Sequence, residues 1–134
     1  MFKRLFGKKE KLDVPPFVLP DESDCRTTES GLRYEVVRAG TGALPCSADK
    51  VTVHYAGWTT EGKLFDASYS RGETTTFPLT AVIKGWTEGL QLMNEGAIFR
   101  FVIPPNLAYV NRGAPPAIGP GETLVFQVEL VTIK

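Results

Sequence analysis

The alternation of apolar and polar residues over residues 50–57 constrains the fold of this chain more than any other feature. Val51, Val53 and Tyr55 share one face of an extended chain, whereas Thr52 lies on the other, because successive side chains of a strand point to opposite faces. A helix would repeat its faces about every 3.6 residues instead. The segment therefore predicts a β-strand with one buried face.

Most of the chain after residue 30 is rich in strand-forming residues. Further strands are predicted, from β-branched and aromatic runs bounded by turn residues, at residues 32–38, 64–66, 74–79, 97–103 and 124–133. Only residues 83–93 predict a helix, because Trp86 and Leu90 lie on one face there. Gly85 and Gly89 each weaken that helix by about 1 kcal/mol relative to alanine, so we expect packing to hold it.

These elements predict an α+β fold, with about five antiparallel strands in a twisted sheet wrapped around one short helix. A length of 134 residues suits one domain, predicted at residues 30–134. Residues 1–29 are predicted to be a basic N-terminal tail and a proline-containing segment that is either a linker or a strap lying on the body.

The charges of the chain balance, with 15 basic and 15 acidic residues, and give no argument for a nucleic-acid partner. The first twelve residues are nevertheless basic, and Phe2, Leu5 and Phe6 among them would allow contact with an anionic membrane surface. A solvated, disordered tail is the favoured interpretation. No apolar run is long enough for a signal peptide or a membrane span, so a cytoplasmic location is expected.

Several kinds of catalytic site are excluded by composition. His54 is the only histidine, so a nucleophile–histidine triad would depend on it alone, and we interpret it as an outward-facing or hydrogen-bonded structural residue. Cys25 and Cys46 are too few for a metal site, and whether they pair is left open. No metal and no cofactor are expected.

Four motifs in a fixed order carry more specific information. They are residues 51–68, with Val-Thr-Val-His-Tyr-Ala-Gly followed by Gly-Lys-Leu-Phe-Asp-Ala-Ser, and residues 82–90, 103–109 and 118–130. Together they resemble the signatures of the FK506-binding-protein (FKBP) type of peptidyl-prolyl cis–trans isomerase. The sequence of residues 30–36 and the Ile-Gly-Pro at residue 118 are most similar to the bacterial macrophage-infectivity-potentiator-like branch.

The resemblance implies a substrate pocket between the sheet and the helix. It implies that Trp86 forms the pocket floor, that Asp66 lies beside the twisting amide, and that Ile118 lies on a loop flanking the mouth. The Tyr109 hydroxyl and the Ile83 N–H would bind the proline segment. The remaining implied lining residues are apolar, with walls formed by Tyr55, Phe65, Phe77 and Phe126 and a rim formed by Val82 and Ile83. The implied catalytic set is Tyr55, Asp66, Trp86 and Tyr109.

The implied activity is acceleration of rotation about Xaa-Pro bonds during protein folding, with proline-containing polypeptides as partners and FK506- or rapamycin-like macrolides as further ligands. Rotation costs ~18–20 kcal/mol because amide resonance is lost, and a site that binds the twisted amide best lowers that barrier without a nucleophile or a metal. Asp66 would either bias the electrostatics of the carbonyl or hold a neighbouring tyrosine or arginine.

The chain departs from the family pattern after Tyr109. Val110 stands where the family usually has glycine, and Ala114 and Ala117 are small residues in the following loop. These differences bear on macrolide affinity and leave an alternative, a proline-motif or macrolide-binding module with little turnover. The dimerising helical region of the infectivity-potentiator branch is absent from the sequence, so a monomer is expected.

Overall fold

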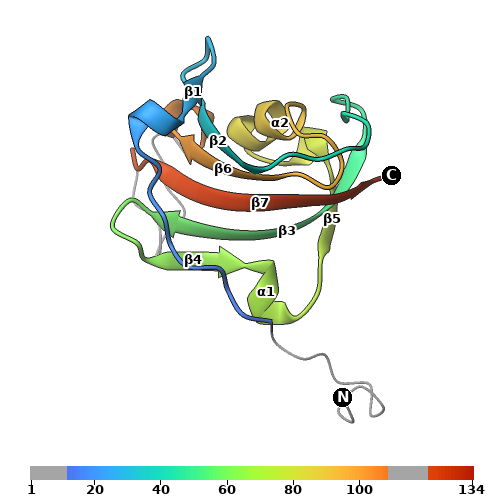
Figure 1. The fold of residues 1–134 in the computed structure, drawn as a ribbon, viewed down its shortest axis with the longest axis horizontal. Coiled ribbons are helices and arrows are strands. Elements are labelled where there is room, and N and C mark those ends of the chain that lie inside the picture. Colours follow the sequence, from blue (N-terminus) through green and yellow to red (C-terminus); the bar gives the residue numbers. More distant parts are fainter. Residues whose placement is uncertain (1–11, 109–120) are drawn as a thin grey trace.

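A single antiparallel sheet curls around one short helix in the computed structural model, which describes residues 12–108 and 121–134 (Figure 1). The sheet has seven strands, of which six follow the order β1-β2-β6-β7-β3-β4 and β5 pairs with β3. The strands are β1 (Arg26–Thr27), β2 (Arg33–Arg38), β3 (Lys50–Thr59), β4 (Leu64–Ala67), β5 (Thr75–Pro78), β6 (Ile98–Ile103) and β7 (Leu124–Ile133).

The helical elements are short and connect the strands. They are α1 (Ser68–Arg71), α2 (Lys84–Leu90) and three 3-10 turns, η2 (Glu22–Asp24), η3 (Leu79–Ala81) and η4 (Pro105–Leu107). The predicted α+β class and the wrapped helix are confirmed, and all six predicted strands form. The count of about five strands was too low. Helix α1 and strand β1 were not predicted, because elements of four and two residues are too short to show periodicity.

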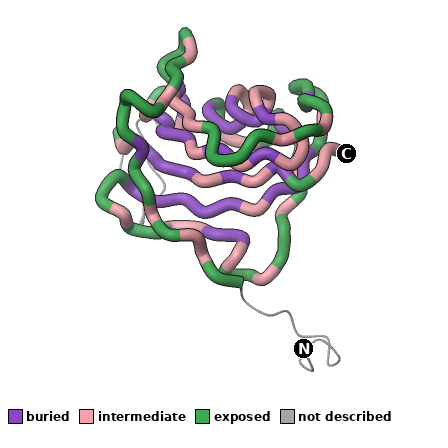
Figure 2. The backbone as a smooth tube through the Cα atoms, in the orientation of Figure 1, coloured by how far each residue is buried: buried purple, intermediate pink, exposed green. Residues whose placement is uncertain are grey.

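The main hydrophobic core lies between the sheet and α2. Val53 of β3, Phe101 of β6 and Leu130 of β7 are almost completely buried there and pack with Leu90 of the helix. Figure 2 shows buried residues concentrated along the central strands and on the helix. The alternation that predicted β3 therefore has its expected cause, a strand with its apolar face on this core.

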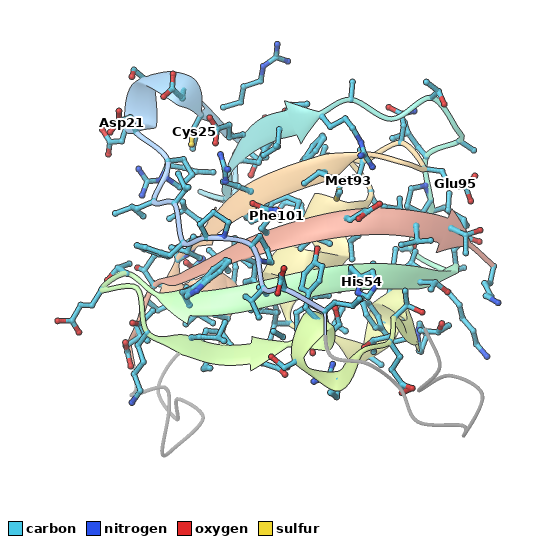
Figure 3. The ribbon with its side chains drawn as sticks, turned by 60° about the horizontal axis from the view of Figure 1, so that its bottom comes forward. Asp21, Cys25, His54, Met93, Glu95 and Phe101 are labelled. Atoms are coloured by element: carbon cyan, nitrogen blue, oxygen red, sulfur yellow. The ribbon has the colours of Figure 1, made fainter. Side chains whose placement is uncertain are left out.

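Two glycines allow α2 to lie directly on β6. A Cβ atom at Gly89 would lie 2.6 Å from Cε1 of Phe101, and one at Gly85 would lie 2.6 Å from Cγ2 of Ile103. In Figure 3, Phe101 is labelled on the sheet, and α2 lies behind the strands. The residues that weaken the isolated helix are thus the ones that permit its closest packing.

A second, smaller cluster covers the outer face of the sheet. Its buried members are Ala56, Trp58, Ala67 and Val125. Residues 12–20 run across this face (Figure 1), where Phe17 makes an edge contact with Trp58 at 5.7 Å between ring centroids. The Leu12 N–H also donates to the Tyr69 carbonyl at 2.9 Å. Of the two alternatives, linker and strap, these contacts fit a strap.

The remaining sequence predictions concern the cysteines, a membrane span and the basic tail. Both cysteines are free, with Cys25 half-buried and Cys46 exposed. Among residues 12–108 and 121–134, no helix combines the length and the apolar character needed to cross a membrane. Most of the basic tail, including Phe2, Leu5 and Phe6, lies outside the described residues.

The close packing of α2 predicts the effect of Gly89→Ala. Alanine favours a helix by about 1 kcal/mol over glycine, but its methyl group would overlap the Phe101 ring, and overpacking of a core costs about 1–3 kcal/mol. We expect a net lower free energy of unfolding in urea titrations. Lys84→Ala, on the exposed surface of the same helix, is the control and should change stability little. A stabilised Gly89→Ala protein would contradict the packing described.

The strap predicts a difference between two neighbouring substitutions. Phe17→Ala removes the ring that covers Trp58 and should lower the free energy of unfolding by about 1–3 kcal/mol. Val18→Ala, at a side chain 37% exposed, should have a much smaller effect. Equal stabilities of the two variants by thermal unfolding would show that the strap does not contribute to the fold.

Candidate functional site

A cavity of about 460 Å³ opens where α2 begins against the sheet. This volume is within the range of about 300–1,000 Å³ that is usual for small-ligand sites. Strands β3, β4, β5 and β7 contribute to it together with the segment from η3 into α2. Its lining residues are Tyr55, Phe65, Asp66, Thr75, Phe77, Ala81, Val82, Ile83, Trp86 and Phe126.

The floor of the cavity is aromatic. Trp86, only 6% exposed, makes edge contacts with Tyr55 at 5.0 Å and with Phe126 at 5.2 Å between ring centroids. Phe77 lies 5.4 Å from the same indole in a tilted arrangement. Edge contacts of this kind are favourable and fix the orientation of each ring. The floor is therefore a rigid apolar surface.

Gly57 of β3 makes room for one wall of the cavity. A Cβ atom there would lie 2.5 Å from Cε1 of Phe126 and 2.7 Å from Cζ of Phe65. Those two rings meet edge to face at 5.5 Å across the position. Any larger residue at 57 would push at least one of the rings away.

The indole N–H of Trp86 is the one buried side-chain polar atom without a hydrogen-bond partner among the described residues. Buried polar groups are usually paired, so an orphan is informative. Here it belongs to a residue of the cavity lining, and it leaves a donor in the floor that no described protein group uses.

A polar corner lies at one side of this apolar floor. The Tyr55 hydroxyl donates to Oδ2 of Asp66 at 2.5 Å, and Nη1 of Arg71 donates to Oδ1 of the same carboxylate at 2.8 Å. Arg71 also donates from Nη2 to the Tyr55 oxygen at 3.0 Å, and its guanidinium lies 5.7 Å from the centroid of the tyrosine ring. Both carboxylate oxygens of Asp66 are thus bonded to neighbouring side chains.

Burial raises the pKa of Tyr55 above its ordinary value. The hydrogen bond to Asp66 raises this pKa further, and the hydrogen bond from Arg71 opposes the shift. The hydroxyl therefore stays protonated at neutral pH. It acts as the donor that fixes the Asp66 carboxylate in place.

Behind the cavity, Ser68 anchors the backbone of Tyr55. Its hydroxyl is fully buried, accepts from the Tyr55 N–H at 2.8 Å and shares a hydrogen bond of 2.9 Å with Nδ1 of His54. His54 stacks on Tyr69 with 4.7 Å between ring centroids. The interpretation of His54 as a hydrogen-bonded structural residue is confirmed.

Eight of the ten residues predicted to bind substrate line the cavity, namely Tyr55, Phe65, Asp66, Phe77, Val82, Ile83, Trp86 and Phe126. The other two, Tyr109 and Ile118, lie outside the described residues, as do Val110, Ala114 and Ala117. The carbonyl of Ile83, the N-cap of α2, accepts from the Trp86 N–H at 3.0 Å. Its own N–H has no acceptor among the described residues.

Three residues at the site were missed by the sequence analysis. Thr75 and Ala81 line the cavity, and Arg71 binds Asp66 and Tyr55. The strand period of two would have put Thr75 on the same face as Phe77. Arg71 belongs to α1, which the sequence did not reveal. No group of three or more His, Cys, Asp or Glu side chains that could hold a metal occurs in the described part of the chain.

Comparisons with known proteins agree with this geometry. Residues 42–131 match the family described as FKBP-type peptidyl-prolyl cis-trans isomerase. The chain is 50% identical over 109 residues to the peptidyl-prolyl cis-trans isomerase Mip of Coxiella burnetii, covering 81% of this chain and 47% of Mip. It is 49% identical over 113 residues to FkpA of Escherichia coli, covering 84% of this chain and 42% of FkpA.

Solved structures show the same fold. The crystal structure of Escherichia coli FkpA superposes with a TM-score of 0.80 over 84% of this chain and 53% of that one, at 49% identity. A peptidyl-prolyl cis-trans isomerase from Pseudomonas syringae gives a TM-score of 0.79 at 36% identity and covers 84% of this chain and 83% of that one. The chain spans less than half the length of the Mip and FkpA sequences. It belongs to the FKBP-type peptidyl-prolyl cis-trans isomerase family.

Proposed function

We propose that this chain catalyses cis–trans isomerisation of Xaa-Pro peptide bonds in polypeptides and so assists their folding. The observation that carries the proposal is a cavity that joins a rigid aromatic floor around Trp86 to a hydrogen-bonded polar corner at Asp66. A proline ring suits the apolar floor, and the amide beside it would meet the polar corner. Membership of the family supports the same reaction.

The chemistry needs no covalent step. Amide rotation is slow because the planar forms keep a resonance worth most of the ~18–20 kcal/mol barrier. Twisting reduces the charge separation of the carbonyl, so an apolar surface favours the twisted amide relative to water. A pocket that binds this state better than either planar form lowers the barrier.

Each residue has a role in this proposal. Trp86 supports the proline ring, while Tyr55, Phe65, Phe77 and Phe126 exclude water from it. The N–H of Ile83, which has no acceptor among the described residues, is proposed as a donor for a backbone carbonyl of the bound segment. Tyr109, outside the described residues, is proposed as a second donor. Such donors hold the peptide in the orientation that rotates.

Of the two roles considered for Asp66, holding its neighbours has the greater support. Its two oxygens are bonded to Tyr55 and Arg71, which leaves less capacity to act on a substrate carbonyl. Asp66 is therefore proposed as a positioning residue. Through Tyr55 it keeps one wall of the pocket fixed.

The finer expectations stay predictions. Binding of FK506- or rapamycin-like macrolides is proposed for the same pocket, since a ligand with a proline-like ring would use the same floor. A monomeric state, a cytoplasmic location and a solvated basic tail rest on the sequence alone. Competition by FK506 in the isomerase assay would test the macrolide proposal.

Replacement of the floor should reduce catalysis. Trp86→Leu keeps an apolar residue but removes the indole, and loss of an aromatic contact worth about 0.5–1.5 kcal/mol predicts a roughly twofold to tenfold lower kcat/KM on an Ala-Leu-Pro-Phe peptide. Trp58→Leu makes the same change on the outer face and should leave kcat/KM of the folded protein near that of the parent. No acceleration by the folded parent would favour the binding-module alternative.

The role of Asp66 can be separated by a double-mutant cycle. If Asp66 acts by holding Tyr55, then Asp66→Asn, Tyr55→Phe and the double variant should all lower kcat/KM by a similar factor. That factor is about tenfold to a hundredfold for a hydrogen bond to a charged group. Additive losses would instead show that the carboxylate acts independently of Tyr55, either on the substrate or through Arg71. Circular dichroism of each variant checks that the fold is kept.

A further inference from the structure

We propose that Thr75 forms a polar subsite that favours substrates whose residue before proline carries a neutral hydrogen-bond acceptor, such as the amide of glutamine. The inference rests on the proposed isomerase function and concerns its specificity. The starting observation is that Thr75 lines the cavity although its neighbours along the wall are apolar.

The strand geometry singles out Thr75 from the threonines on either side of it. Thr75 begins β5, is paired with Val53 of β3, and lines the cavity together with Phe77, two residues further on. Thr76 lies on the opposite face, where its hydroxyl is hydrogen-bonded to that of Thr52 at 2.7 Å. The side chain of a β-branched residue in a paired strand has few rotamers. The Thr75 hydroxyl therefore has a defined place in the wall.

The hydrogen bonds of the Thr75 hydroxyl leave its hydrogen unused within the described residues. A threonine hydroxyl carries one hydrogen and two acceptor lone pairs. Arg71 Nη2 donates to Oγ1 of Thr75 at 3.2 Å and occupies one lone pair. No acceptor for the hydroxyl hydrogen occurs among the described residues. Thr75 is thus a donor without a protein partner in that part of the chain.

The other polar side chains of the corner are already committed. The Tyr55 hydroxyl donates to Asp66, and both carboxylate oxygens of Asp66 accept from protein groups. Among the described side-chain hydroxyls and carboxylates that line the cavity, Thr75 therefore offers the unused donor. A substrate acceptor would gain a bond there without displacing a bond within the protein.

The position of Thr75 indicates which part of a substrate it meets. In the proposed mechanism the rotating amide lies beside Asp66 and Tyr55, and Thr75 is joined to these residues through Arg71. The residue before proline supplies the carbonyl of that amide, so its side chain is the nearest side chain on the carbonyl side of the rotating bond. The charges of Asp66 and Arg71 pair with each other, and the rest of the lining is mostly apolar. A neutral acceptor is preferred there because it costs less to desolvate than a carboxylate.

The test compares two peptides that differ in this side chain. Isomerisation of Ala-Gln-Pro-Phe and Ala-Leu-Pro-Phe is measured with the full chain, and the ratio of the two kcat/KM values is the readout. Thr75→Val removes the hydroxyl at nearly constant shape and should lower the glutamine-to-leucine ratio about threefold to tenfold. Thr75→Ser should keep the ratio. Thr74→Val, an exposed neighbour that does not line the cavity, is the matched control and should also keep it.

The outcomes separate this inference from the proposed function. If Thr75→Val changed kcat/KM by the same factor for both peptides, Thr75 would act only as a wall or through Arg71. The subsite would then be wrong, and the isomerase function would stand. A lower glutamine-to-leucine ratio in Thr75→Ser would also contradict the subsite, because serine keeps the hydroxyl donor. A folded parent that accelerates neither peptide would refute the proposed function, and the subsite with it.

Discussion

The contact between α2 and β6 is the interaction on which the rest of the structure depends. A seven-residue helix is too short to be stable alone in water, and two of its residues are glycines. Those glycines let the backbone approach Phe101 and Ile103 closely, and the buried apolar area supplies the stability that the helix lacks. The same contact fixes the first turn of α2, which carries Trp86. Core packing and the floor of the pocket are therefore one arrangement.

The pocket combines two surfaces whose physical properties differ. Its aromatic floor is held by edge contacts between rings, while its polar corner is held by hydrogen bonds among Tyr55, Asp66 and Arg71. The Asp66–Arg71 pair is about half exposed, so it contributes little to stability. The pair instead fixes the orientation of the side chains in the polar corner. Side chains that are ordered before binding lose no further conformational entropy when a substrate binds.

One short element connects the pocket with the outer face of the sheet. Helix α1 supplies Arg71 to the polar corner and Tyr69 to the outer cluster, and the strap is bonded to the Tyr69 carbonyl. It ends at Gly72, whose positive φ of 71° favours glycine. Residues 12–20 therefore stabilise the element whose Arg71 holds two residues of the pocket lining, Tyr55 and Asp66. Residues 12–20 are distant in sequence from most of the pocket residues, but in the fold they contact α1, which carries Arg71.

The sequence by itself determined six of the seven strands, the helix around Trp86 and eight residues of the pocket. Alternating apolar residues can bury one face only as strands, and ordered motifs identify the family. Tertiary structure alone decided the roles of Arg71 and Thr75. Arg71 reaches Asp66 only because α1 turns the chain back toward β3, and the Thr75 hydroxyl meets Arg71 only because β5 pairs with β3. Short turns and strand register depend on contacts between distant segments, so local sequence patterns do not reveal them.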